Sequence, residues 1–468
     1  FNPNVTNHAE CCNSSPALFT SLNGEGDLWV VEFLMTDVVL NTGDTAWVLA
    51  STALVLLMTP GLALFYGGMV RVKSVLNMMM MSMITIGIVS VLWVIYGFKL
   101  AFGFEAESAW YGSISLSGLG SAVNSLTNNG GVYPIPLLVF AAFQLMFAVI
   151  TPALISGAIA DRAKFFSWGI FVALWSTIVY FPVAHWVFAF GNKVGDSITG
   201  AGFLAAKGVE DFAGGTAVHI NAGAAGLALA IVLGRRVGWR KEAMRPHSLP
   251  LVLLGAGLLW FGWFGFNAGS ALGANGIAAL ALMNTQVATA AALIGWLLAE
   301  RLRDGHPTSL GAASGAVAGL VAITPACAFV APWAAVVIGF LAGIFCAMAV
   351  GIKYRFNFDD SLDVVGVHFV GGVWGCLSIG FFGSSAVNSL GLNGIFYGGG
   401  STLLGKQALG VLLVAGYSFI VTLILGFIIE KTIGFRVKPE VEISGIDLKE
   451  HAESAYELAP STRGGFSS

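Results

Sequence analysis

Charge is scarce in this sequence. Asp, Glu, Lys and Arg make up 10% of the 468 residues, whereas a soluble domain has about 25%. The apolar share is 56%, and the mean hydropathy is +0.82. Such a composition excludes a string of soluble domains and indicates that lipid is the main solvent of the chain. The formal net charge of −3 gives no indication of a nucleic-acid partner.

Cysteine is also rare. The five cysteines are Cys11, Cys12, Cys327, Cys346 and Cys376. None of them stands at metal-ligand spacing, and three lie in apolar runs, where a free cysteine packs as a small hydrophobic residue. We therefore expect no disulfide framework and no zinc site. We also expect no cofactor and no enzymatic activity.

Long apolar runs fill most of the chain. A membrane-spanning helix needs about 20 mostly apolar residues. Eleven runs reach about this length, at residues 45–66, 75–98, 134–160, 166–190, 214–233, 248–270, 276–298, 308–326, 332–352, 362–382 and 407–429. The sequence therefore predicts an all-α integral membrane protein with eleven transmembrane helices.

Basic residues fall in alternate loops between these runs. All but four of the 22 Lys and Arg residues lie in one set of loops and in the carboxyl-terminal segment. The exceptions are Lys99, Lys193, Lys207 and Lys406. Because cytoplasmic loops carry the excess of basic residues, we predict that the amino end lies outside and the carboxyl end in the cytoplasm.

An odd number of spans with opposite-facing termini suggests an inverted repeat of two five-helix halves. Residues 211–223 read DFAGGTAVHINAG, and residues 360–372 read DSLDVVGVHFVGG. Both stretches place Asp eight residues before His, at Asp211 and His219 and again at Asp360 and His368. They open the fifth and the tenth span, as the last helices of two equivalent halves should.

The two ends of the chain differ from its apolar core, which we place at residues 45–433. Residues 1–44 are polar and predict an extracellular leader. A natural start at Met35, which would make that leader non-native, stays open as an alternative. Residues 434–468 are charged and contain a periodic stretch at 446–456, which predicts a cytoplasmic tail with a helix lying against the membrane domain.

Two of the seven histidines stand out by their depth in the spans. His219 and His368 have no charged neighbour in the sequence, and an ionisable residue at such depth is a functional candidate. Equivalent positions of an inverted repeat meet near the midplane, so we expect the two imidazoles to face each other and to share one hydrogen bond. Two separate core histidines are the alternative. His185 lies near Pro182, and we interpret it as bonded to a carbonyl group freed by the proline kink.

Asp211 is a candidate helix cap. Eight residues of helix put it about 12 Å along the axis from His219, so direct proton transfer is disfavoured. An Asp followed by small residues typically accepts hydrogen bonds from the first N–H groups of a helix, here those near Ala213 and Gly214. Its charge would also favour a cation at the entrance.

Aromatic residues concentrate in two spans, as FAAFQLMF at 140–147 and LWFGWFGFN at 259–267. Aromatic residues in spans usually belong to the core or the interfacial belt. Above a dry pore, however, such rings would hold a small cation by cation–π attraction worth about 0.5–2 kcal/mol per ring.

Five motifs in order resemble the ammonium transporter (Amt/Mep/Rh) family, and its ammonium branch in particular. They are PGLALFYGG, FQLMF, DFAGGTAVHINAG, GWFGFNAGS and GVHFVGGVWG. The resemblance covers about residues 45–456. It implies transport of ammonium or ammonia across the cell membrane by recruitment of the ion, its deprotonation and conduction of ammonia.

The resemblance also implies a role for each matching residue. The implied roles are a twin-histidine pore at His219 and His368, a gate at Phe147 and Phe266, an outer recruitment site at Phe143, Phe147, Ser270 and Phe188, a pore wall at Trp263 and an entrance acid at Asp211. Many family members have Trp where this chain has Phe188, and Trp186 lies two residues earlier.

The family further implies a homotrimer in the lipid bilayer, with a pore in each subunit and a regulatory cytoplasmic tail. In bacteria, a PII-type signal protein is the implied partner on that face. Two other functions remain open, namely an ammonium sensor and a Rhesus-type neutral gas channel. A pure sensor would not restore the growth of a transporter-deficient strain on low ammonium. A neutral gas channel would carry no electrical current when ammonium is added.

Overall fold

The computed structural model describes residues 40–103, 108–116, 118–123, 125–127, 134–194 and 197–456. The predicted leader up to residue 39, including Cys11 and Cys12, and the tail from residue 457 lie outside the described residues. Cys327, Cys346 and Cys376 are buried free thiols, as their apolar surroundings predict.

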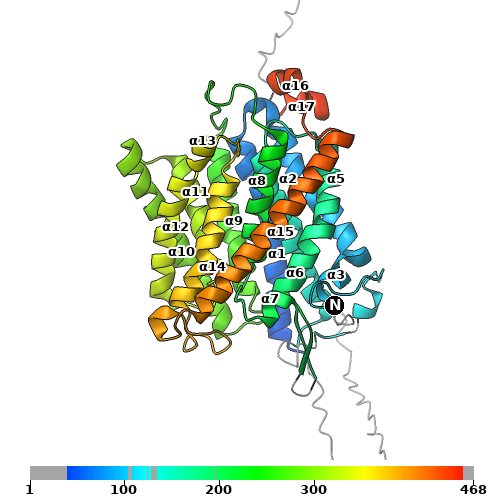
Figure 1. Cartoon of the computed structure of the whole chain (residues 1–468), viewed down its shortest axis with the longest axis vertical. Coiled ribbons are helices and arrows are strands. Elements are labelled where there is room, and N and C mark those ends of the chain that lie inside the picture. The colour runs from blue at the N-terminus through cyan, green and yellow to red at the C-terminus, as the bar shows by residue number, and fades with distance from the viewer. Residues whose placement is uncertain are drawn as a thin grey trace, which may run out of the picture. The chain divides into compact units, whose positions relative to one another are not determined.

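Helices make up most of the described structure (Figure 1). The long helices are α1 (Thr42–Met69), α2 (Val75–Leu92), α4 (Leu137–Ser156), α5 (Phe165–Trp175), α8 (Asn221–Leu233), α9 (Leu249–Gly269), α10 (Gly276–Asp304), α11 (Ser309–Ile323), α12 (Pro332–Ala349), α14 (Val370–Phe382) and α15 (Thr402–Thr432). The shorter α-helices are α3 (Phe98–Phe102), α6 (Phe181–Phe188), α7 (Phe203–Ala206), α13 (Ile352–Phe356), α16 (Pro439–Ser444) and α17 (Ile446–Glu450). The 3₁₀ turns are η1 (Val72–Ser74), η3 (Gly120–Ala122), η4 (Gly157–Ile159) and η8 (Ile395–Tyr397).

Ten continuous helical segments within the described residues are long and apolar enough to cross a membrane. They correspond to ten of the eleven predicted runs. The remaining run, 308–326, forms α11, which has 15 residues. The predicted all-helical membrane architecture is confirmed. One addition to it is an antiparallel hairpin of β1 (Phe190–Val194) and β2 (Ser197–Ala201).

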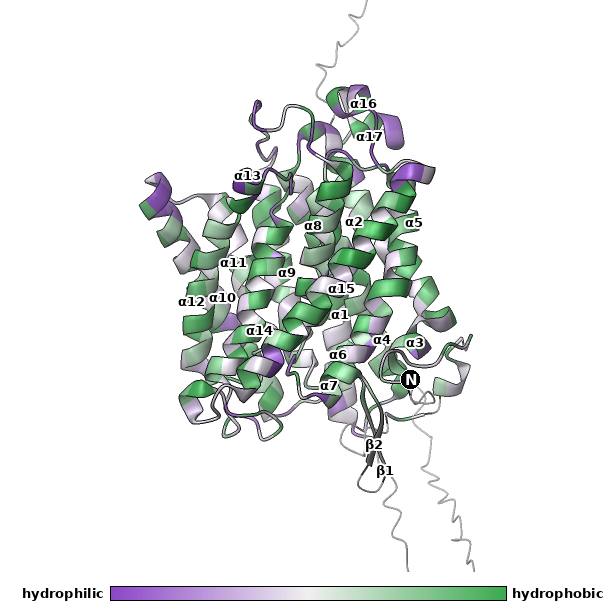
Figure 2. Ribbon diagram, in the orientation of Figure 1, coloured by the Kyte–Doolittle hydropathy of each residue, from purple (hydrophilic) through white to green (hydrophobic). Residues whose placement is uncertain are grey.

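Apolar residues cover the long helices along their middle, while hydrophilic residues gather at their ends and in the loops (Figure 2). One end of the bundle carries α16 and α17, and the other carries α7 and the β1–β2 hairpin (Figures 1 and 2). This distribution is the one that a lipid-solvated bundle requires, because lipid cannot hydrate charged groups.

Small residues allow the helices to approach closely. α1 packs mainly against α9, and a Cβ added to Gly255 would lie 2.3 Å from the backbone nitrogen of Phe65. Gly223 on α8 is equally confined, because its Cβ would lie 2.6 Å from the backbone nitrogen of Phe369. The high glycine content is thus used for packing, as in other membrane bundles.

Four π-helical turns interrupt the spans. They are η2 (Trp93–Gly97), η5 (Ser176–Tyr180), η6 (Gly215–Ile220) and η7 (Val365–Phe369). η6 leads into α8 and η7 leads into α14, so each half of the predicted repeat ends in a helix that begins with such a turn. π-Helical turns often occur at functional sites.

A buried ionic cluster joins the loops at the end that carries α16 and α17. Arg236 donates two hydrogen bonds of 2.9 Å to the carboxylate of Asp359 and one of 3.2 Å to Asp161. Burial alone would raise the pKa of Asp359, but the hydrogen bonds from Arg236 and the charge of Arg162 hold it below its ordinary value. Each buried charge is therefore paired, as a low-dielectric site demands.

The tail is docked at the same end of the bundle, on the first turn of α2 and on the loop that contains Val237. Asp447 on α17 accepts hydrogen bonds from the backbone N–H groups of Leu76 and Asn77 at 3.0 and 2.8 Å. Glu442 on α16 pairs with Arg436 at 2.8 Å and accepts a bond from the N–H of Val237 at 2.6 Å. These contacts fix the tail at least as far as α17 against the membrane domain.

Candidate functional site

The two intramembrane histidines lie side by side. His219 belongs to η6 and His368 to η7, and their Nδ1 atoms are 3.4 Å apart. Both residues are buried. The Nε2 atom of His219 is also buried, and it has no hydrogen-bond partner among the described residues. One imidazole nitrogen therefore stays available to a small molecule in an otherwise apolar surrounding.

Asp211 caps the turn that carries His219. Its carboxylate accepts hydrogen bonds from the N–H groups of Gly214, Gly215 and Thr216 at 2.7–2.8 Å. The carboxylate therefore holds the start of η6, but the N-cap residue of η6 is Gly214 and not Asp211, and the donors start one residue later than expected. The reason is Gly214, whose φ of 118° directs three successive N–H groups toward one carboxylate. None of the hydrogen bonds of this carboxylate goes to His219.

Asp360 caps the second turn in the same way. It accepts hydrogen bonds from the N–H groups of Val364 and Val365 at 3.1 and 2.7 Å. The repeated Asp-to-His spacing of the sequence thus corresponds to a repeated structural unit, in which a buried carboxylate holds the start of a helix and the helix holds an imidazole. The sequence contained this signal, although only Asp211 was assigned a role from it.

A series of aromatic rings leads to His219. The ring centroids of Phe143 and Phe147 are 5.0 Å apart, and those of Phe147 and Phe266 are 4.3 Å apart. Phe266 lies 6.1 Å from the imidazole of His219, and Trp263 stacks on the same imidazole at 5.4 Å and 18°. The Trp263 indole donates a hydrogen bond to Thr324 Oγ1 at 2.8 Å, which fixes its orientation. α4 and α9 supply the rings.

Ser270 and Phe188 lie near this series in different ways. Ser270 ends α9, and its hydroxyl donates to the carbonyl of Phe266 at 2.8 Å. Phe188 approaches the turn at Gly214, where its Cζ lies 3.7 Å from the position of an added Cβ. Phe188 forms no ring pair with Phe143 or Phe147 among the described aromatic contacts.

Trp186 belongs to a separate aromatic cluster and forms no ring pair with Phe143 or Phe147 among the described aromatic contacts. Its ring lies 5.4 Å from Phe203 and 4.8 Å from Tyr417. His185 differs from expectation too, because its ring nitrogens lie 2.9 and 3.0 Å from the carbonyl oxygens of Ala101 and Ser108. The interpretation that it bonds a carbonyl freed by Pro182 was therefore wrong.

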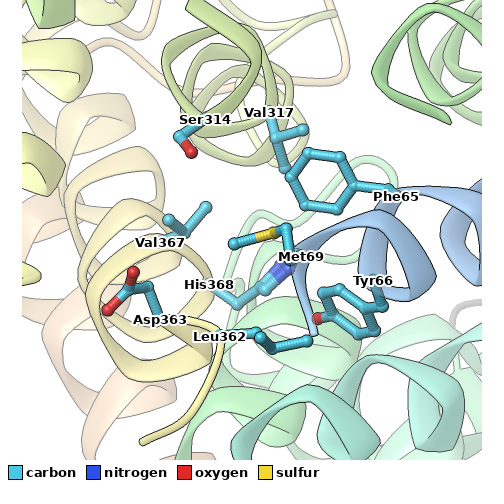
Figure 3. A pocket seen from close by; sticks show the side chains of 9 residues that line it. All are labelled: Phe65, Tyr66, Met69, Ser314, Val317, Leu362, Asp363, Val367 and His368. Atoms are coloured by element: carbon cyan, nitrogen blue, oxygen red, sulfur yellow. The ribbon is translucent and has the colours of Figure 1, made fainter. Parts of the chain in front are cut away.

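A narrow cavity lies beside His368 (Figure 3). It is lined by Phe65, Tyr66, Met69, Ser314, Val317, Leu362, Asp363, Val367 and His368. It leaves about 10 Å³ for the centre of a water-sized molecule, which is room for about one water. Asp363 is paired with Lys353 at 2.6 Å. Sequence reasoning assigned no role to Asp363, although it stands within the second repeat.

The described residues contain no group of three His, Cys, Asp or Glu side chains that could hold a metal ion. The arrangement is instead a buried series of aromatic rings that ends at a pair of imidazoles. It can attract a small cation through ring faces, and it can accept or pass a proton at the histidine pair.

Comparison with known proteins agrees with this architecture. The model of the Ammonium Transporter Family matches residues 46–456. An ammonium transporter of Mycobacterium tuberculosis is 56% identical over 435 residues, covering 89% of this chain and 91% of its own length. The crystal structure of Saccharomyces cerevisiae Mep2 is similar with a TM-score of 0.78 and 32% identity, over 86% of this chain and 88% of that one.

A solved structure described as a sensor Amt protein is similar to the same degree. Its TM-score is 0.78 at 30% identity, and the match covers 87% of this chain and 98% of that one. The matched family is one of transporters and not of enzymes. Because the family model spans nearly all of the described residues, the chain belongs to the ammonium transporter family.

Proposed function

We propose that this chain transports ammonium by binding the ion, removing its proton and conducting ammonia past His219 and His368. One observation carries the proposal. The ring series from Phe143 through Phe147 and Phe266 ends at His219, whose Nε2 has no partner among the described residues. A cation site, an apolar passage and a proton acceptor thus follow one another.

Desolvation decides which species crosses. A lone ion in a low-dielectric passage loses hydration worth many kcal/mol, whereas neutral ammonia loses far less. We therefore place the ion outside the gate, at Phe143, Phe147, Ser270 and Phe188, where ring faces stabilise a cation. The rings of Phe147 and Phe266, 4.3 Å apart and tilted by 36°, form the gate at which the proton leaves.

The histidine pair supplies the proton path. Two imidazoles 3.4 Å apart can share one proton and pass it on, which a purely apolar tube cannot. If the pair relays the proton, net charge crosses without a bare ion. The carboxylate of Asp211 already holds three N–H groups, so we assign it to shaping the entrance and favouring a cation there.

The ten apolar helical segments make this a multi-pass membrane protein, and we assign it to the cell membrane. We place the amino end outside and the end with α16 and α17 in the cytoplasm. The basic cluster of Arg71, Arg162 and Arg236 at that end supports this orientation under the positive-inside rule.

A groove on the outer surface of α9 and α10 supports assembly into a homotrimer. Gly257, Trp260, Phe261, Phe264 and Gln286 line it. The Trp260 Nε1 atom has no partner among the described residues, and Gln286 exposes an amide in a span. The indole nitrogen is itself buried, so it is the exposed Gln286 amide that needs a partner from another helix in lipid.

We further propose that residues 45–433 form the transport domain and residues 434–468 a regulatory tail, with a PII-type signal protein as the partner on this face. The docking of α16 and α17 supports a tail that responds to such a partner. Sensing is the second candidate function, favoured by the similarity to the sensor Amt protein.

Growth of a transporter-deficient strain on low ammonium tests the proposal. A transporter restores growth and a pure sensor does not. Current across proteoliposomes on ammonium addition then distinguishes charge-moving transport from a neutral gas channel. Failure of the purified protein to accelerate ammonium or ammonia flux into proteoliposomes would contradict the function.

A further inference from the structure

The exposed apolar face of α12 continues through α13. Together with the two residues between them, these helices form one apolar segment, Pro332–Phe356, of 25 residues. Met348, Ile352 and Phe356 are 56%, 39% and 69% exposed. Residues four apart lie on one face of a helix, so these three side chains form a single apolar stripe. Such a stripe belongs in lipid, and it reaches the last residue of α13.

The length of this segment sets the depth of α13 in the membrane. Its 25 residues rise about 37 Å, whereas the hydrocarbon core is about 30 Å thick and the whole bilayer about 40–45 Å. α13 lies at the end of the bundle that carries α16 and α17 (Figure 1). The excess length therefore places α13 among the lipid headgroups, which are those of the cytoplasmic leaflet in the proposed orientation.

Two arginines from the loop between α8 and α9 are fastened to α13. Arg235 Nε donates to the carbonyl of Asn357 at 3.1 Å, and Arg240 Nη1 donates to the carbonyl of Tyr354 at 3.5 Å. The Trp239 ring stacks on Tyr354 at 5.9 Å and 14°. The guanidinium carbons of Arg235 and Arg240 lie 5.5 and 5.7 Å from the centroid of the same indole. Both cations are thus held around one ring at headgroup depth.

The charge around this ring is positive and largely unpaired. The loop 234–248 contains five basic residues and one acidic residue, Glu242. Arg236 is paired with Asp161 and Asp359. Within the part of the chain that the structure describes, the ion pairs include neither Arg235 nor Arg240. Guanidinium groups bind phosphate strongly, and tryptophan and tyrosine favour the membrane interface.

We propose that Arg235 and Arg240, held around Trp239 beside α13, bind the phosphate of an anionic phospholipid in the cytoplasmic leaflet. The apolar stripe that ends at Phe356 contacts the acyl chains of the same lipid. This stripe is what favours a lipid over a soluble anion, because a free phosphate has no use for exposed apolar side chains. The site is separate from the ring series and the histidine pair of the proposed transport path.

Native mass spectrometry of the purified protein, titrated with single lipids, tests the proposal. Wild type should bind phosphatidylglycerol about tenfold or more tightly than phosphatidylcholine, which has the same chains but no net charge. Arg235→Gln/Arg240→Gln should weaken phosphatidylglycerol binding about thirtyfold, as expected for two interfacial charges. Equal affinity of wild type for the two lipids, or equal affinity of wild type and this variant for phosphatidylglycerol, would overturn the proposal.

Arg301→Gln/Lys431→Gln is the matched control. It removes two exposed basic residues from the last turns of α10 and α15, so the net charge changes equally, and its affinity should stay within about twofold of wild type. Arg235→Lys/Arg240→Lys keeps both charges and should retain most of the affinity. If the glutamine pair fails to fold, Arg240→Gln alone should still weaken binding about fivefold. Equal losses in the control and in the Arg235→Gln/Arg240→Gln variant would reduce the site to net charge and overturn it.

Competition identifies the source of the phosphate. Glycerol phosphate carries the charge of the headgroup without acyl chains, and a large excess of it should not displace phosphatidylglycerol from wild type. Phe356→Ser should weaken phosphatidylglycerol binding while the arginines remain. Full displacement by glycerol phosphate, together with unchanged binding in Phe356→Ser, would show a site for a soluble anion and overturn the assignment to a lipid.

Discussion

The Nδ1 atom of His219 faces the Nδ1 atom of His368 across 3.4 Å, while the Nε2 atom of His219 has no partner among the described residues. Two imidazole nitrogens at this distance can share one proton. In the transport path proposed above, this pair is the part on which charge movement would depend.

Replacing either histidine with alanine should remove ammonium current. His219→Ala and His368→Ala leave an apolar passage without a proton acceptor, and we expect the current to fall about a hundredfold or more. The measurement compares proteoliposome currents at equal protein abundance. His306→Ala, in an exposed turn, is the control and should conduct like wild type. Undiminished ammonium-selective current in both pore variants would show that the pair is not the conducting element.

An acidic residue at the same place should change selectivity. In His219→Asp, a fixed negative charge and the water it retains would offset part of the desolvation of a metal cation. We therefore expect a potassium current that wild type lacks. Potassium and ammonium currents are recorded from the same vesicles, and His219→Asn is the uncharged comparison. Equal potassium exclusion by all three proteins would argue against an apolar barrier at this point.

Replacing Asp211 should lower the stability of the folded protein. Asp211→Ala leaves three buried N–H groups without an acceptor, and loss of a cap typically costs about 1–2 kcal/mol. Asp211→Asn keeps one acceptor oxygen and should lose less. Thermal unfolding in detergent, followed by tryptophan fluorescence, measures both, and the matched pair at Asp360 should behave alike. If Asp211→Ala is as stable as wild type, the carboxylate is not a structural cap.

Removing the tail beyond Gly434 should reduce or uncouple transport while the protein remains assembled in the membrane. The truncation removes Glu442 and Asp447, which bind backbone N–H groups of the loop at Val237 and of the first turn of α2. Uptake rate and oligomeric state in the membrane are measured together. Truncation after residue 456 is the control because it spares these contacts. Full transport with unchanged regulation after the longer truncation would leave the tail without the proposed role.

Glu210 should make stability depend on pH. Burial raises the pKa of its carboxyl from 4.5 to about 7, against the hydrogen bond from the N–H of Leu392 and the charge of Lys406. The folded protein then holds this proton more tightly than the unfolded chain. The contribution is most favourable below about pH 4.5, falls as pH rises to about 7 and is constant above.

Apparent melting temperatures of wild type and Glu210→Gln over this range isolate the effect. The wild-type value should decline relative to that of the variant as pH rises from about 4.5 to 7. Glu242→Gln, at an exposed loop position, should track wild type. Parallel curves for wild type and Glu210→Gln would mean that the carboxyl is not shifted.

Much of the architecture could be predicted because lipid imposes simple rules. Apolar runs of sufficient length become helices, and every predicted run overlaps a helix. The pairing of His219 and His368 was predictable because the repeat placed each of them eight residues after an Asp. In both cases, a pattern within the sequence carried the information.

Features that depend on one left-handed residue or on distant backbone atoms could not be predicted in this way. The one-residue shift of the Asp211 cap follows from the φ of Gly214, which no sequence pattern specified. The carbonyl partners of His185 lie 84 and 77 residues earlier. The docking of Asp447 on Leu76 joins residues 371 positions apart, and only the folded chain brings them together.

Because α11 is short, backbone carbonyl groups that follow it need hydrogen-bond partners inside the bundle. Fifteen residues of helix rise about 22 Å, less than the roughly 30 Å of hydrocarbon in a bilayer, so its carboxyl end turns where no water reaches it. There the amide of Asn284 on α10 donates to the carbonyls of Cys327 and Val330, both at 2.8 Å. The Asn284 side chain thus supplies hydrogen bonds that water would supply at the surface. From hydropathy alone, a polar residue at this position would only lower the score of the span.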